Sequence, residues 1–143
     1  MKKYLFLFLC SFLVFFGFKS NIYADSIDLV RIGGNYYESL IDAINAAGEN
    51  DVIYLLSDIK LDASLNIDKP VTINLNNKTI SADNLVFKIQ NGTLNLIGNG
   101  VVKEEKPFYG AVLLKGSDNI DDTYYSNLSV ANGVLLEGWS GIF

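Results

Sequence analysis

After Gly48, most of the chain consists of short runs in which apolar and polar residues alternate. A period of two is typical of strands that bury one face and expose the other. Four of these runs resemble one another and cover residues 51–56, 71–75, 93–97 and 127–131. The pattern predicts β structure for residues 49–143.

The matching runs recur at a regular interval. Their central apolar pairs lie 20, 21 and 34 positions apart, in the order Ile53 with Leu55, Ile73 with Leu75, Leu94 with Leu96, and Leu128 with Val130. Each repeat has a second apolar run, at 59–61, 79–80, 101–102 and 134–136, and three repeats have a third, at 65–67, 85–89 and 111–114. An outward insertion at 103–107 or 115–126 would account for the longest interval.

Three short strands per repeat of about 20 residues indicate a parallel β-helix, in which neighbouring coils share one core. We expect an all-β fold with about four coils. The alternative is a β-sandwich, because the turn pairs Asn91-Gly92, Asn99-Gly100 and Asn132-Gly133 also suit antiparallel hairpins. The repeat interval favours the β-helix.

One helix is predicted before the repeats. Asn35 and Glu38 form a capping-box pattern, and Gly48 suits a helix end. The pattern predicts a strand over 27–32 and an amphipathic helix over 36–47 within an N-terminal unit, 25–48. We expect the helix to cover the first coil with the apolar residues Tyr37, Leu40, Ile41 and Ile44.

Residues 1–24 have the features of a signal peptide helix. Lys2 and Lys3 precede an uncharged apolar run of 15 residues, and Ala24 suits the position before a cleavage site. A membrane-spanning helix needs about 20 apolar residues. We predict a secreted or cell-surface protein that is free of the membrane after cleavage; the alternative is an uncleaved anchor. The only cysteine, Cys10, would leave with the signal.

Composition and charge exclude two possibilities, a disordered chain and a nucleic-acid partner. Of the 143 residues, 50% are hydrophobic and 19% charged, which excludes intrinsic disorder. Cleavage would remove three of 11 basic residues and leave 8 against 16 acidic ones, a net charge of −8. Nucleic acid is therefore not an expected partner.

No catalytic motif is present in the sequence. Histidine is absent, and Arg31 is expected before the helix rather than on a coil face. The acidic residues Asp58, Asp62, Asp68 and Asp83 fall mostly at expected turns. We therefore expect no row of acidic and basic residues on one coil face, and no enzyme activity.

Two groups of residues are candidates for binding. Asp118, Asn119, Asp121 and Asp122 supply oxygen ligands suited to Ca²⁺, the only cofactor considered; the alternative is a solvated loop. Exposed aromatic residues suit sugar faces, and the candidates are Phe108, Tyr109, Tyr124, Tyr125 and Trp139. The alternative is that they cover the core or a coil edge.

Residues 37–47, 51–58 and 65–80 resemble the start of bacterial secreted right-handed β-helix proteins of the pectin-lyase-like superfamily, especially large adhesin-like surface proteins. Asn77 stands where these proteins commonly have Gly. The resemblance implies a right-handed parallel β-helix. It does not imply one activity, since the superfamily includes lyases, hydrolases, adhesins and tailspikes. The histidine motif of polygalacturonases is absent.

The sequence predicts a non-enzymatic, adhesin-like exported protein that contacts carbohydrate or a host or matrix surface. Residues 133–143 are rich in apolar side chains, so we expect an N-terminal piece of a longer protein that self-associates through its last coil. The alternatives are a remnant of a polysaccharide lyase or hydrolase, and a β-sandwich binding module.

Overall fold

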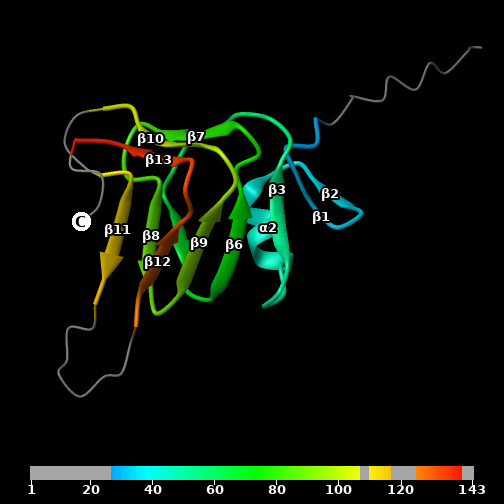
Figure 1. Ribbon diagram of the computed structural model, residues 1–143, viewed down its shortest axis with the longest axis horizontal. Coiled ribbons are helices and arrows are strands. Elements are labelled where there is room, and N and C mark those ends of the chain that lie inside the picture. The colour runs from blue at the N-terminus through cyan, green and yellow to red at the C-terminus, as the bar shows by residue number, and fades with distance from the viewer. Residues whose placement is uncertain (1–26, 107–109, 117–124, 140–143) are drawn as a thin grey trace, which may run out of the picture.

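The computed structural model describes residues 27–106, 110–116 and 125–139, and within them the chain forms strands and one short helix (Figure 1). The predicted signal peptide lies outside these residues. The elements are β1 Val30–Ile32, β2 Asn35–Tyr37, α2 Leu40–Ala46, β3 Val52–Leu55, β4 Ile59–Leu61, β5 Leu65–Ile67, β6 Pro70–Asn74, β7 Lys78–Ala82, β8 Phe87–Gln90, β9 Thr93–Ile97, β10 Gly100–Glu104, β11 Val112–Lys115, β12 Asn127–Val130 and β13 Val134–Glu137.

The strands are distributed over three sheets. Their orders are β12-β9-β6-β3-β1-β2, β13-β10-β7-β4 and β11-β8-β5. Consecutive strands go to successive sheets, so β3, β4 and β5 are followed by β6, β7 and β8 stacked beside them. Among β3 to β13, every described pair is parallel. The prediction of a β-rich fold is confirmed, whereas the antiparallel hairpins of the sandwich alternative do not form at the Asn-Gly pairs.

Most of the predicted repeat alignment is confirmed. Ile53 pairs with Ile73, and Leu94 pairs with Leu128. The prediction was wrong at one step, because Ile73 pairs with Leu96 rather than Leu94. A register shift of two residues keeps every side chain on the same face of the strand. Alternation therefore could not distinguish these two registers.

The extra residues of the longest interval lie mainly between β11 and β12. β11 ends at Lys115 and β12 begins at Asn127, whereas Gln90 and Thr93 are the facing ends of the preceding pair, β8 and β9. The structure therefore favours residues 115–126 over 103–107 as the main insertion.

The inward side chains form one hydrophobic core between the sheets. Ile53, Ile73 and Leu96 make a row across three strands, and each has no exposed surface. Phe87 of β8 is the largest of the fully buried side chains. Burial of such rows is the main driving force for stacking the strands.

The helix begins later than the sequence predicted. Ser39 is the N-cap, and its Oγ accepts a hydrogen bond from the Asp42 backbone N–H at 3.1 Å. Asn35 instead starts β2, which pairs antiparallel with β1 through a turn at Gly33, where φ is +55°. In this hairpin, residues 36–37, which the sequence assigned to the helix, pair with β1 instead.

Helix α2 packs against the hydrophobic core with part of the predicted face. Leu40 and Ile44 are buried as expected, but Ile41 is 51% exposed and Tyr37 packs from β2 instead. The buried face of α2 consists of Leu40, Ala43 and Ile44, and Ile41 lies outside it. Figure 1 shows α2 and the β1–β2 hairpin together at one end of the stack, with β11 to β13 at the other.

Asparagines shape the corner between the first two sheets. Asn76 and Asn77 have φ values of 50° and 60°, in the left-handed region that asparagine tolerates. The Asn76 side chain donates to the Leu55 carbonyl at 2.9 Å, and Asn77 N–H donates to the Asn99 carbonyl at 2.6 Å. These bonds link successive repeats, and asparagine can occupy this position because it tolerates a positive φ.

Candidate functional site

The outward face of the sheet β4-β7-β10-β13 carries a row of polar and charged side chains. The parallel register places Lys60, Ser81, Lys103 and Glu137 next to one another, one from each strand. They border a shallow groove of about 520 Å³ that Asp58, Thr79 and Glu105 also line. The expectation that no row of acidic and basic residues lies on one coil face was therefore wrong.

A network of ion pairs crosses this face. Lys60 Nζ lies 2.9 Å from Asp83 Oδ1 and 2.7 Å from Glu105 Oε2. Lys106 pairs with the other oxygen of Asp83, and Lys103 Nζ lies 3.7 Å from Glu137 Oε2. These side chains are substantially exposed, so the ion pairs orient the side chains more than they stabilise the fold.

The network shifts the protonation of its members. Hydrogen bonds from Lys106 and then Lys60 lower the pKa of Asp83 to about 2. Hydrogen bonds from Lys60 and then Ser81 lower the pKa of Glu105, and the bond to Glu105, followed by that to Asp83, raises the pKa of Lys60. At neutral pH both carboxylates are ionised and Lys60 is protonated.

This arrangement suits binding better than proton transfer. A general acid of a glycosidase needs a carboxyl group whose pKa is raised, and Asp83 and Glu105 have the opposite shift. A general base needs an unprotonated group, and Lys60 holds its proton. The groove therefore presents charges of both signs at neutral pH.

Asp58 has a structural contact at the edge of the groove. Its Oδ1 accepts a hydrogen bond from the Thr79 backbone N–H at 2.8 Å, which links one coil to the next. The sequence placed Asp58 at a turn, and the structure agrees. This hydrogen bond helps to hold β7, one of the strands that carry the charged row, in place.

Arg31 lies on β1, which precedes α2 as the sequence predicted and joins the six-stranded sheet. β1 extends the six-stranded sheet by pairing with β3, so Arg31 faces Tyr54 on one side and Tyr36 on the other. Its guanidinium carbon lies 4.5 Å from the centre of the Tyr54 ring, in cation–π geometry. The sequence did not reveal this contact because the antiparallel hairpin was not foreseen.

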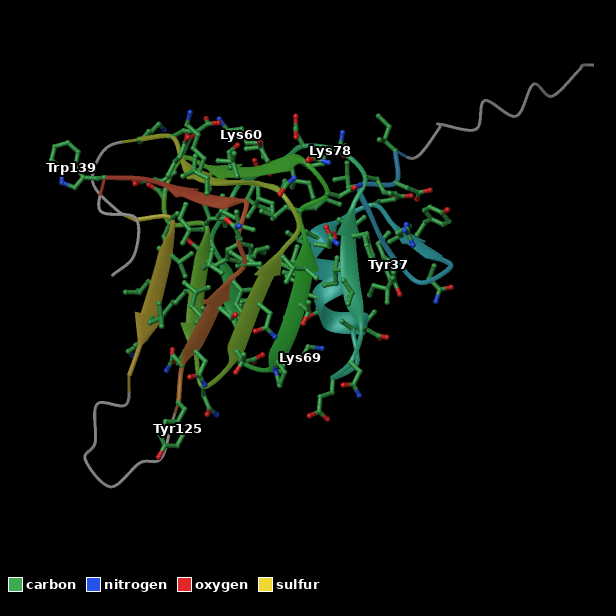
Figure 2. The ribbon with its side chains drawn as sticks, viewed as in Figure 1. Tyr37, Lys60, Lys69, Lys78, Tyr125 and Trp139 are labelled. Atoms are coloured by element: carbon green, nitrogen blue, oxygen red, sulfur yellow. The ribbon has the colours of Figure 1, made fainter. Side chains whose placement is uncertain are left out.

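Two predicted ligand-binding aromatics are in the described residues. Tyr125 and Trp139 are 71% and 76% exposed, which rules out the core alternative for both. Figure 2 shows Trp139 at the upper left of the molecule and Tyr125 at its lower edge, well apart, so the two do not form one site. Phe108, Tyr109 and Tyr124 lie outside the described residues.

The predicted calcium loop, Asp118 to Asp122, also lies outside the described residues. In the part of the chain that the structure describes, no group of three or more His, Cys, Asp or Glu side chains is arranged to hold a metal ion. Within those same residues, the structure has no helix with the length and hydrophobicity needed to span a membrane.

No protein-family model, curated protein or solved structure matches this chain. The resemblance to the pectin-lyase-like superfamily therefore stays a prediction.

Proposed function

We propose that the chain forms an exported, adhesin-like right-handed parallel β-helix, whose charged outer face binds carbohydrate or a host or matrix surface. The strand order supports the β-helix, because each sheet receives every third strand and the pairing from β3 onward is parallel. The apolar run before Ala24 supports export.

The charged row on β4, β7, β10 and β13 carries the binding proposal. Lys60, Lys103 and Glu137 stand on neighbouring strands, which are about 4.8 Å apart in any sheet. A ligand with regularly placed hydroxyl and carboxylate groups can meet several of these side chains at once. Because the backbone below them is hydrogen-bonded in the sheet, little backbone conformational entropy is lost on binding.

The second candidate, a remnant of a polysaccharide lyase or hydrolase, has less support. The same row contains acids and a base in a groove, but the lowered pKa of Asp83 and the raised pKa of Lys60 oppose proton transfer. We therefore place binding ahead of catalysis.

A glycan array tests the proposal. The purified protein is applied to neutral, uronate-containing and sulfated oligosaccharides and to immobilised matrix proteins, and the best ligand is titrated by calorimetry. We expect binding that falls about tenfold or more in the double variant Lys60→Ala, Lys103→Ala, because each lysine supplies a charge-assisted hydrogen bond. Lys88→Ala, on β8 in the third sheet, is the matched control and should bind normally.

Three results would count against this function. The array could show no binding, the control could lose as much affinity as the double variant, or the protein could cleave its ligand. Release of unsaturated uronides or new reducing ends would support the enzyme alternative.

A further inference from the structure

The outward face of the six-stranded sheet carries a single charge. The strands of this sheet, as the structure describes them, contain one charged residue between them, Arg31 of β1. The other outward positions of β3, β6 and β9 hold apolar, aromatic, hydroxyl or amide side chains. This face therefore differs from the charged row, where lysines and carboxylates are paired.

The charge of Arg31 is not neutralised by a carboxylate. Among the residues that the structure describes, no acidic side chain lies within ion-pair distance of it. Its Nη1 donates to the Gly33 carbonyl at 3.1 Å, and its guanidinium stacks over the Tyr54 ring. Stacking uses the flat face of the group, so the remaining N–H donors stay available at its edge. Arg31 is thus held in place with donors to spare for an anion.

Aromatic and amide side chains extend this row to both sides of Arg31. Strand pairing places Tyr36 and Tyr54 beside Arg31, and Asn74 of β6 follows Tyr54. Tyr36 is 59% exposed, so its ring is open to a ligand. Three strand spacings separate Tyr36 from Asn74, which is about 14 Å. The row is therefore long enough for more than one sugar ring.

The polar groups at the Asn74 end of the row are neutral. Asn74 Oδ1 accepts the Asn76 backbone N–H at 3.0 Å, which leaves the NH₂ group of the same side chain as a donor. Beside it, Asn95 Nδ2 donates to Thr72 Oγ1 at 3.3 Å. Amides and hydroxyls of this kind suit sugar hydroxyls, and the exposed Tyr36 ring suits the apolar face of a sugar.

The charge of this face limits the ligand to one anionic group. A carboxylate can form two parallel hydrogen bonds with the guanidinium of Arg31. A second carboxylate on the same ligand would meet no cation of these strands. The chain also has a net charge of −5, which repels a polyanion. The face therefore suits an oligosaccharide with a single carboxylate better than a polyuronate or a sulfated chain.

We propose that the row Tyr36, Arg31, Tyr54 and Asn74 is a second binding site, for an oligosaccharide in which one acidic terminal sugar is followed by neutral sugars. Arg31 binds the carboxylate, Tyr36 stacks on a sugar ring, and Asn74 donates to a hydroxyl. The ligand is a carbohydrate, as in the proposed function, but the site lies on a different sheet and does not depend on the charged row.

Calorimetry with three oligosaccharides tests the ligand class. Sialyllactose has one carboxylate on its terminal sugar, lactose lacks the acidic sugar, and a hexuronate oligomer of the same length as sialyllactose has a carboxylate on every ring. We expect sialyllactose to bind, and lactose to bind at least about tenfold more weakly. The hexuronate oligomer should also bind more weakly than sialyllactose, because its further carboxylates find no cation.

Substitutions locate the site. Arg31→Gln should raise the Kd for sialyllactose by about tenfold or more, because the charge-assisted pair is lost. Arg31→Lys should recover only part of the affinity, since an ammonium lacks the planar fork. Tyr36→Ala should weaken binding by about threefold. Lys88→Gln is the matched control: it removes one positive charge from β8, in another sheet, and should bind normally.

No binding of sialyllactose would overturn the proposal. So would equal affinity for lactose, tighter binding of the hexuronate oligomer, or equal losses in Arg31→Gln and Lys88→Gln. Circular dichroism shows whether each variant is native, and if Arg31→Gln does not fold, Arg31→Lys and Tyr36→Ala decide.

The double variant Lys60→Ala, Lys103→Ala separates this site from the charged row. It should bind sialyllactose normally. Loss of sialyllactose binding in the double variant, with normal binding in the Arg31 variants, would refute this site and leave the charged row as the binding face. Loss in the Arg31 variants alone would support this site, whatever the glycan array shows for the charged row.

Discussion

Gly100 shows how closely neighbouring coils approach at a single residue. A Cβ atom added there would lie 2.5 Å from the Lys78 carbonyl oxygen and 2.6 Å from Leu75 Cβ, and φ is +152°. Neither neighbour can move without displacing the chain, because a backbone atom and a buried side chain are involved. The position therefore requires glycine for space and for conformation.

We predict that Gly100→Ala lowers the free energy of unfolding by about 2 kcal/mol or more. Urea denaturation followed by circular dichroism measures the change. Gly116→Ala is the control, since a Cβ there meets nothing within 4 Å, and it should change stability by less than about 0.5 kcal/mol. Equal losses in the two variants would refute the steric argument.

Asp83 makes the stability of the fold depend on pH in the acid range. Its pKa is lowered to about 2 in the folded chain, chiefly by Lys106 and Lys60, from an unfolded value of about 3.9. A lowered carboxyl pKa stabilises the fold above the unfolded pKa, and this contribution is lost as the pH falls toward 2. We expect the thermal unfolding midpoint to decrease as the pH is lowered from 5 to 2. The decrease should be smaller in Asp83→Asn.

Asp62→Asn is the matched control for the pH series. Leu61 pairs with Ala82, so Asp62 and Asp83 occupy equivalent positions in successive coils. The control should keep the pH dependence of the original protein. High salt should weaken the dependence, since the ion pairs of Asp83 are exposed. An unchanged pH profile in Asp83→Asn would contradict the assignment.

At the scale of elements, the start of α2 shows which residue caps the helix. Asn35 and Ser39 both suit an N-cap, but only Ser39 accepts the Asp42 N–H. We predict that Ser39→Ala costs about 1 kcal/mol of unfolding free energy. Asn35→Ala should cost clearly less, because Asn35 lies in the exposed strand β2. Thermal unfolding of both variants measures the difference, and a larger loss in Asn35→Ala would contradict this cap.

The end of α2 depends on a residue far along the chain. Lys69 Nζ donates to the carbonyls of Asn45 and Ala47, at 3.1 and 2.9 Å. These carbonyls have no partner within a helix at its C-terminal end, and a lysine there also suits the helix dipole. The sequence indicated Gly48 as the stop but could not indicate Lys69, which precedes β6.

At the scale of the whole molecule, packing should weaken toward β12, a terminal strand of the six-stranded sheet. Val102 of β10 is fully buried, whereas Val130 of β12 is 38% exposed. We predict that Val102→Ala lowers the free energy of unfolding by about 2–3 kcal/mol, through lost burial and a cavity. Val130→Ala should cost less than about 1 kcal/mol.

Denaturant titration at a concentration where the chain is monomeric measures this pair. The two variants remove the same atoms, so the difference reports only the environment of the side chain. Equal losses would mean that the core is as tightly packed at β12 as in the middle of the stack.

The charged row illustrates why the candidate site escaped sequence analysis. Lys60 and Glu105 are 45 residues apart, yet Nζ and Oε2 lie 2.7 Å apart. Predicting that contact requires the exact register of β4, β7 and β10. The sequence interpretation assigned Asp83 to a turn, and this did not reveal that two lysines converge on it.

From β3 onward, the sequence by itself determined which runs form strands and which face of each strand points inward, because alternation with a period of two specifies the two faces of a strand. It also indicated three strands per repeat, which agrees with the three sheets, whose strands are parallel from β3 onward. Only the tertiary structure decided which residues are neighbours: Ile73 beside Leu96, Arg31 over Tyr54, and Lys60 between Asp83 and Glu105. The physical reason is that face follows from local pattern, whereas register depends on contacts between residues that are distant in the chain.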